Sequence, residues 1–136
     1  MSTRSKARKR ALEVLFEAEQ REVSPVAALR QRREAVAQIV NPYTVTLVEG
    51  VLAQQERLDE ILGTYAKGWT LDRMPSVDRS VLRIGAWEIL FNDEVPDGVA
   101  VAEAVALVRD LSTDESPEFV NGLLGRIQQL KPTLLA

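Results

Sequence analysis

Cysteine and histidine are both absent from the 136-residue sequence. Without cysteine the chain has no disulfide framework and no thiolate nucleophile. Without histidine it has no imidazole base and none of the usual zinc sites. Apolar runs long enough to span a bilayer are missing too, and the basic N-terminus lacks the apolar segment that would follow in a secretory signal. We therefore expect a cytoplasmic protein with no membrane segment, metal or cofactor.

Motifs of enzymatic sites are equally scarce. The acidic residues are scattered and form no convergent carboxylate pair, and without histidine or cysteine nothing supports a hydrolytic site. The stretches GVLAQQ and GLLG lack the glycine spacing and the lysine of a phosphate-binding loop. The sequence therefore predicts a protein that is not an enzyme.

Charge is unevenly distributed, although the net charge is only −3. The first ten residues contain five basic residues and no acid, whereas the rest of the chain has 12 basic and 20 acidic residues. The five basic residues are Arg4, Lys6, Arg8, Lys9 and Arg10. A basic end on an acidic body is typical of nucleic-acid contact, although a charge run can also simply be solvated.

A central helix is predicted over residues 77–91, where apolar residues recur at spacings of three and four. They spread around most of the helix, so we expect other elements to cover it, with Leu82 and Trp87 in the core. Pro75 and Ser76 just before it are typical of a helix start. Gly85 in its middle costs about 1 kcal/mol relative to alanine, which predicts that a second helix crosses closely there.

Further helices are predicted on both sides of this segment. Their ranges are 4–21, 26 to about 38, 43 to about 66, 99 to about 111, and 116 up to Pro132, with a short turn at 70–74. No strand-like alternation appears, and the length suffices for one core. The sequence therefore predicts an all-α fold, a compact bundle of about seven helices. We expect two packed subdomains, about 1–68 and about 69–136, within a single domain.

Four separated stretches resemble the NusB family. They are ARKRALEVLFEAEQ, WTLDRMPSVDRSVLR, VPDGVAVAEAVALVRDLS and FVNGLLG, which occur in the family's order and span nearly the whole chain. NusB proteins are antitermination factors of ribosomal RNA transcription with an all-helical fold of two small bundles. The resemblance implies that this chain binds boxA, a short single-stranded element of the ribosomal RNA leader. It also implies that NusE, a small-subunit ribosomal protein, binds with it.

The resemblance also implies which residues contact the RNA. One group is the basic N-terminal cluster, which matches the family's arginine-rich contact. The second group consists of Thr113, Asp114, Glu115, Ser116 and Phe119. Glu115 stands where some relatives have aspartate, so its carboxylate reaches further.

Two residues, Phe16 and Asp78, match positions that face NusE. Phe16 replaces a tyrosine common in relatives, so a hydroxyl contact is missing. We expect Asp78 to be exposed on the first turn of the central helix, although an acid there could equally complement the helix dipole. Phe16 lies about 9 Å beyond Arg10 along a helix, which predicts adjoining contacts for NusE and RNA.

The aromatic residues allow two interpretations. Phe119 beside a polar loop could be a stacking platform for a base, but its spacing to Leu123 favours the first core residue of its helix. Trp69 and Trp87 are expected in the core or in subunit contacts rather than as RNA platforms.

The sequence thus predicts an RNA-binding antitermination factor that joins NusE on boxA. Other elongation factors and RNA polymerase would be indirect partners, and a monomer and a homodimer both stay open. The alternative is a protein-binding helical adaptor with no direct RNA contact. A third class is the RNA-binding domain fused to ribosomal RNA methyltransferases, in which a catalytic domain would follow, whereas this chain stops at Ala136.

Overall fold

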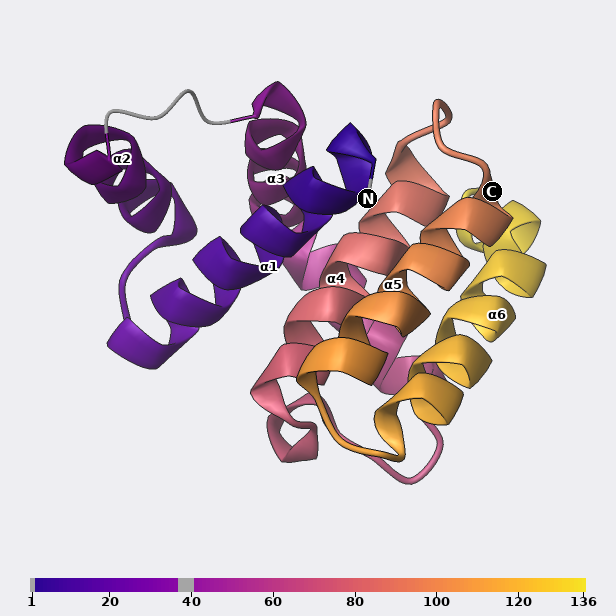
Figure 1. Ribbon diagram of the computed structural model, residues 1–136. Coiled ribbons are helices and arrows are strands. Elements are labelled where there is room, and N and C mark those ends of the chain that lie inside the picture. The colour runs from indigo at the N-terminus through magenta and orange to yellow at the C-terminus, as the bar shows by residue number, and fades with distance from the viewer. Residues whose placement is uncertain (1, 37–40) are drawn as a thin grey trace. The chain divides into compact units, whose positions relative to one another are not determined.

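The computed structural model describes residues 2–36 and 41–136, with side chains described for 2–31 and 41–136 (Figure 1). These ranges contain α1 (Thr3–Arg21), α2 (Pro25–Val36), α3 (Pro42–Tyr65), the 3-10 helix η1 (Leu71–Arg73), α4 (Ser76–Phe91), α5 (Asp97–Leu111) and α6 (Ser116–Leu134). No strand occurs within them, which confirms the all-α class, with six α-helices instead of about seven. The predicted end of the second helix near residue 38 lies outside the described residues. No described helix has the length and apolar character needed to cross a membrane.

The chain forms two compact units, residues 1–53 and 54–136. The division falls inside α3, whereas the sequence suggested one near Gly68, in the loop after that helix. The physical reason is the length of α3, whose 24 residues belong partly to each unit. The boundary between the units therefore lies within a helix and not in the loop that follows it.

In unit 1, α1 packs against α2 and the start of α3. The Ser2 hydroxyl caps α1 by accepting from the backbone N–H of Ser5 (3.0 Å). The inward stripe of α1 contains Ala7, Ala11, Leu12, Val14, Leu15 and Ala18. The Thr44 hydroxyl of α3 donates to the backbone carbonyl of Ala7 (3.0 Å), so the first turns of α1 are part of the packed structure.

In unit 2, α4 lies against α5 and α6, and the three helices run side by side in Figure 1. Leu82 and Trp87 are buried on α4, as predicted. A Cβ added to Gly85 would lie only 2.7 Å from Cδ1 of Leu124 on α6. This confirms the close helix crossing that the mid-helix glycine predicts.

Helix ends agree with the sequence at some positions and differ from it at others. The Asn41 side chain accepts from the Tyr43 N–H (2.9 Å) at the start of α3. The last helix, α6, begins at Ser116, the residue at which the sequence places its start. Pro132 was expected to end that helix, and this prediction is wrong, because α6 continues to Leu134. The proline's missing N–H falls in the last turn, where it removes only one helical hydrogen bond.

Candidate nucleic-acid interface

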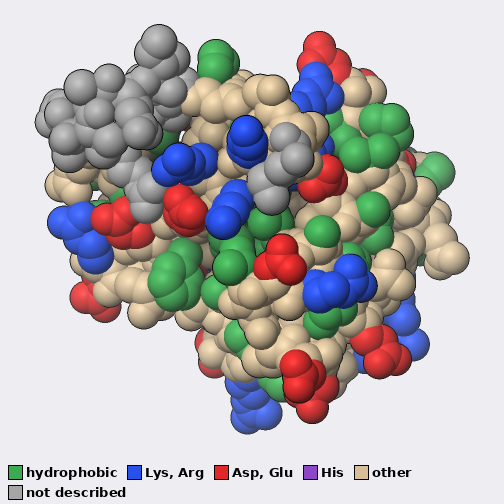
Figure 2. Space-filling model, in the orientation of Figure 1, with side chains coloured by type: hydrophobic (Ala, Val, Ile, Leu, Met, Phe, Trp, Pro, Cys, Tyr) green, Lys and Arg blue, Asp and Glu red, His purple; other side chains and the backbone are tan. Residues whose placement is uncertain are grey.

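Four of the five basic residues at the start of α1 are exposed: Arg4, Lys6, Lys9 and Arg10. Figure 2 shows Lys and Arg side chains gathered over the first half of this helix. The first turn has no acidic residue, and the positive end of the helix dipole points the same way. The start of α1 therefore combines four exposed cations with a positive helix end, a combination that attracts anions.

Arg8 departs from the predicted pattern because its side chain is only 2% exposed. It shares a face of α1 with Arg4, one turn earlier, and both guanidinium groups lie near the Tyr43 ring. Their distances to the ring centroid are 5.1 Å for Arg4 and 5.8 Å for Arg8. The expectation that Arg8 belongs to an open RNA-contacting surface is therefore corrected. Its helical position puts it beside the buried Ala7 and Ala11, where it packs within unit 1.

Phe16 lies further along α1 and is 36% exposed, among the larger exposed apolar side chains of the described residues. Six residues separate it from Arg10, or about 9 Å of helix. The exposed cations and this apolar ring thus lie on one rigid element, as the sequence predicts.

Asp78 is buried, with 2% of its surface exposed, so the expectation of an exposed anchor is wrong. Its carboxylate accepts hydrogen bonds from the hydroxyls of Ser112 (2.7 Å) and Ser116 (2.8 Å). The first turn of α4 is thereby tied to the end of α5 and the start of α6. The physical reason is that these three helix ends converge in unit 2, where the carboxylate can accept from one buried and one partly buried hydroxyl.

The loop before α6, which the resemblance predicts to contact RNA, has both exposed and buried side chains. Thr113, Asp114 and Glu115 are exposed, whereas Ser116 is 1% exposed. The Ser116 hydroxyl also accepts from the backbone N–H of Thr113 (3.2 Å), which holds the loop in a tight turn. Ser116 therefore fixes the loop's shape, and the prediction that it touches RNA directly is corrected by its burial.

Arg79, the next residue on α4, holds a second loop in unit 2. Its guanidinium donates to the carbonyl oxygens of Leu71 (2.7 Å) and Met74 (3.2 Å) around η1, and to the Ser76 hydroxyl (3.2 Å). Burial, and then the nearby charge of Arg83, lower the pKa of Arg79. An arginine still stays protonated at neutral pH, so these are charge-assisted hydrogen bonds.

Phe119 and Trp69 face each other between these two loops. Their ring centroids are 5.9 Å apart with a 45° tilt, a normal aromatic pair geometry. Phe119 is only partly buried and Trp69 is 48% exposed. Trp69 is therefore not a core residue, and Phe119 is only partly in the core. Trp87 is in the core, as expected. An exposed tryptophan could not be recognised from spacing, because Trp69 lies in the break between two helices, where no periodicity applies.

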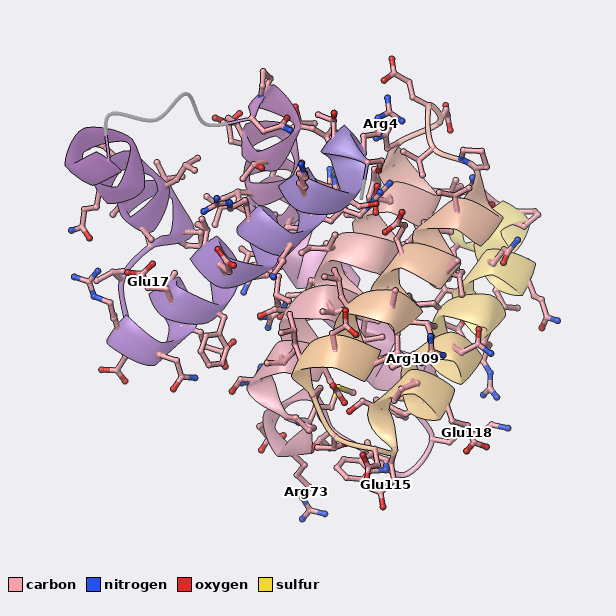
Figure 3. All side chains as sticks on the ribbon, in the orientation of Figure 1. Arg4, Glu17, Arg73, Arg109, Glu115 and Glu118 are labelled. Carbon is pink, nitrogen blue, oxygen red and sulfur yellow. The ribbon has the colours of Figure 1, made fainter. Side chains whose placement is uncertain are left out.

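A surface hollow of about 500 Å³ lies beside this aromatic pair. Its lining joins η1 to the loop before α6 and consists of Trp69, Arg73, Pro75, Asp78, Thr113, Glu115, Ser116 and Phe119. Figure 3 shows Arg73 and Glu115 at the same end of unit 2. Sequence reasoning did not assign Arg73 to the site. No group of three or more potential metal ligands occurs among the residues that the structure describes.

Comparisons with known proteins show which sequences and folds this chain is similar to. The NusB family model matches residues 5–129. The chain is 69% identical over 136 residues to the transcription antitermination protein NusB of Arthrobacter sp. (strain FB24), and all of both chains is covered. The structure of T. maritima NusB matches with a TM-score of 0.84 and 28% identity over 94% of this chain and 92% of that one.

A second solved structure contains antitermination factors NusB and NusE in complex with dsRNA. A chain of that complex matches with a TM-score of 0.82 and 26% identity, over 93% of this chain and 96% of that one. The family model covers nearly the whole sequence, and the curated relative is similar from end to end. The chain therefore belongs to the NusB family.

Proposed function

We propose that this protein is a transcription antitermination factor that binds the single-stranded boxA element of ribosomal RNA leader transcripts together with NusE. It supports processive transcription of ribosomal RNA in the cytoplasm, with RNA polymerase and other elongation factors as indirect partners. It acts by binding, without catalysis. Family membership and the name of the 69% identical relative support this function, as does the similarity to a complex of NusB, NusE and RNA.

The observation that carries the proposal is the exposed basic start of α1. Arg4, Lys6, Lys9 and Arg10 are exposed on two successive turns, on a chain whose net charge is −3. Each phosphate that such cations neutralise releases condensed counterions, which favours binding and makes it depend on salt. Arginine side chains can also stack on the unpaired bases of a single strand.

The remaining site residues have two kinds of role in this proposal. Thr113, Asp114 and Glu115 offer exposed polar groups to the RNA, and a carboxylate can accept hydrogen bonds from base amino groups. Ser116 and Asp78 act through the loop that they hold in place.

NusE binds next to Phe16 in this proposal. An exposed phenylalanine on a regular helix offers a rigid apolar contact, the kind of anchor that interfaces favour. Asp78 contributes to that interface only indirectly, because its carboxylate is turned into unit 2 and bonded to two serines. The polar anchor for NusE that the resemblance implied is thus replaced by a positioning role.

The experiment compares two double variants with equal charge change. Lys6→Gln with Arg10→Gln removes two exposed cations from the start of α1, and Arg30→Gln with Arg109→Gln removes two exposed cations elsewhere. Fluorescence anisotropy with labelled boxA RNA should show about 5- to 30-fold weaker binding for the first variant, since each exposed contact contributes about 1 kcal/mol or less. The slope of log affinity against log salt should fall by about 1.4, as expected for two single-strand phosphates.

The control variant should bind within about twofold of the wild type. Equal losses in both variants would mean that only the net charge matters. Unchanged RNA affinity in the first variant, with NusE binding intact, would instead favour the helical adaptor with no direct RNA contact.

A further inference from the structure

The hollow in unit 2 is built from two loops that the first turn of α4 holds separately. Asp78 fixes the loop before α6 through Ser112 and Ser116. Arg79 fixes the segment around η1 through the carbonyls of Leu71 and Met74. The two walls are therefore anchored by charged hydrogen bonds from neighbouring residues of one buried helix. Such anchoring keeps the space open without a ligand and lowers the ordering cost of binding.

The lining of the hollow combines an aromatic face with polar groups of both signs. Trp69 supplies the exposed ring and Phe119 the partly buried one. Arg73 is exposed and makes no ion pair among the described residues, and Glu115 belongs to the same lining. The volume of about 500 Å³ falls in the range of about 300–1,000 Å³ typical of small-molecule sites.

We propose that this hollow receives one unpaired nucleobase of the bound RNA, stacked on Trp69 beside Phe119. Arg73 donates to an acceptor on the base edge, and Glu115 accepts from an exocyclic amino group. The proposal rests on the RNA-binding function above and extends it to Trp69 and Arg73. It predicts that adenine, guanine and cytosine are preferred over uracil, because uracil has no amino group.

Phe119 also lines a smaller hollow of about 180 Å³. Its charged lining residues are Lys67, Arg126 and Glu118, and neither of the two cations makes an ion pair among the residues described. Phe119 thus borders both an aromatic hollow and a hollow in which two cations outnumber one acid. This arrangement fits a single strand whose base enters the first hollow while an adjacent phosphate lies by the second, as in other sites that combine stacking with cations.

Intrinsic fluorescence tests the stacking directly, because the protein has only two tryptophans. Trp69 is 48% exposed and Trp87 is buried, so a base stacked on Trp69 should quench only the emission of Trp69. We expect boxA RNA to quench the wild-type protein and to leave the Trp69→Phe variant nearly unchanged. That variant should bind RNA within about threefold of the wild type, because phenylalanine keeps an aromatic face.

Affinity measurements with Trp69→Ala complete the test. We expect about 5- to 100-fold weaker binding of boxA RNA, the range for loss of one stacked base, and unchanged NusE binding. Val99→Ala, a change at an exposed apolar residue at the far end of α5, should bind like the wild type. Arg73→Gln should weaken RNA binding by up to about fivefold, whereas Arg109→Gln, which is also exposed but lies outside the hollow, should not.

A scan of RNAs with a single abasic nucleotide identifies the base that is bound. At one position the abasic RNA should bind wild type and Trp69→Ala equally weakly, because the stacking partner is already gone. Equal affinity of wild type and Trp69→Ala for intact RNA, without quenching, would overturn this inference alone. Loss of NusE binding in Trp69→Ala with RNA affinity unchanged would show a protein-binding hollow and overturn it as well. If the wild type bound no RNA even with NusE, the proposed function would fail together with this inference.

Discussion

At the scale of single residues, burial decides what a charge does. Asp78 and Arg8 are charged residues that the sequence predicts to be exposed, yet each is only 2% exposed. Asp78 accepts from two hydroxyls, and Arg8 lies near an aromatic ring. The helical periodicity of apolar residues indicates which face of a helix is buried. It does not indicate how far neighbouring elements also cover the residues at the edge of that face, so the sequence could not show that these two side chains are buried.

Replacing Asp78 should destabilise the fold. Asp78→Ala removes the acceptor of two hydrogen bonds and leaves the Ser112 and Ser116 hydroxyls without that partner. We expect a loss of about 2–4 kcal/mol in the free energy of unfolding, since hydrogen bonds to charged groups contribute about 1.5–3 kcal/mol each and partly overlap. Urea unfolding followed by circular dichroism measures this loss. An unchanged midpoint, with NusE binding lost, would restore Asp78 as an exposed anchor.

Gly85 offers a second test at this scale. An alanine Cβ would lie 2.7 Å from the Leu124 side chain, so overpacking of about 1–3 kcal/mol should outweigh the gain of about 1 kcal/mol in helix propensity. Gly85→Ala should therefore lower stability slightly in the wild-type background. In a Leu124→Ala background the clash is gone, and the same change should raise stability by about 1 kcal/mol. A destabilising effect of equal size in both backgrounds would show that the close crossing is not the cause.

At the scale of elements, α1 carries two functions on different faces. Its buried stripe holds unit 1 together, and its exposed cations form the proposed RNA contact. Deletion of residues 1–10 would remove buried Ala7, whose carbonyl accepts from Thr44. It would therefore disturb the fold, so point substitutions separate the two functions better than truncation.

Arg8 and Arg10 form the matched pair for this separation. Arg8→Gln should lower stability by about 1–2 kcal/mol, because a partly desolvated cation–π contact is lost. Arg10→Gln should leave stability within about 0.5 kcal/mol and weaken boxA binding, since Arg10 is exposed. Thermal melts and anisotropy on both variants give the two readouts. The account would be contradicted if Arg10→Gln lowered the melting temperature as much as Arg8→Gln.

Sequence patterns predicted the helices well, because apolar periodicity reports directly on burial. The central helix was placed at 77–91 and is found at Ser76–Phe91, and Leu82 and Trp87 are in its core. The loops were harder to predict, because their side chains are placed by tertiary hydrogen bonds. The clamp of Arg79 on η1 and the exposed ring of Trp69 follow from such contacts. Residue spacing gave no sign of either.

At the scale of the whole molecule, the proposed function requires RNA and NusE to favour each other's binding. The exposed cations and Phe16 share α1, and Phe16 lies about 9 Å along the helix axis from Arg10, the nearest of these cations. A second protein at Phe16 can therefore add RNA contacts of its own without displacing the arginines. Linkage then requires that NusE tighten RNA binding by the same factor by which RNA tightens NusE binding.

Phe16→Ala isolates the contribution of NusE to this coupling. Phe16 is 36% exposed, so the change should cost little stability and leave RNA affinity without NusE unchanged. With NusE present, RNA affinity should fall towards the value for this protein alone. If Phe16→Ala left the effect of NusE at its full size, the NusE contact would lie elsewhere.

The most direct test of the account is one titration of labelled boxA RNA with this protein, performed with and without saturating NusE at physiological salt. The account predicts binding in both cases, with affinity about 5- to 150-fold higher when NusE is present, corresponding to a coupling of about 1–3 kcal/mol. A boxA sequence with its bases scrambled should lose most of this gain. An RNA affinity that NusE leaves unchanged would contradict the account.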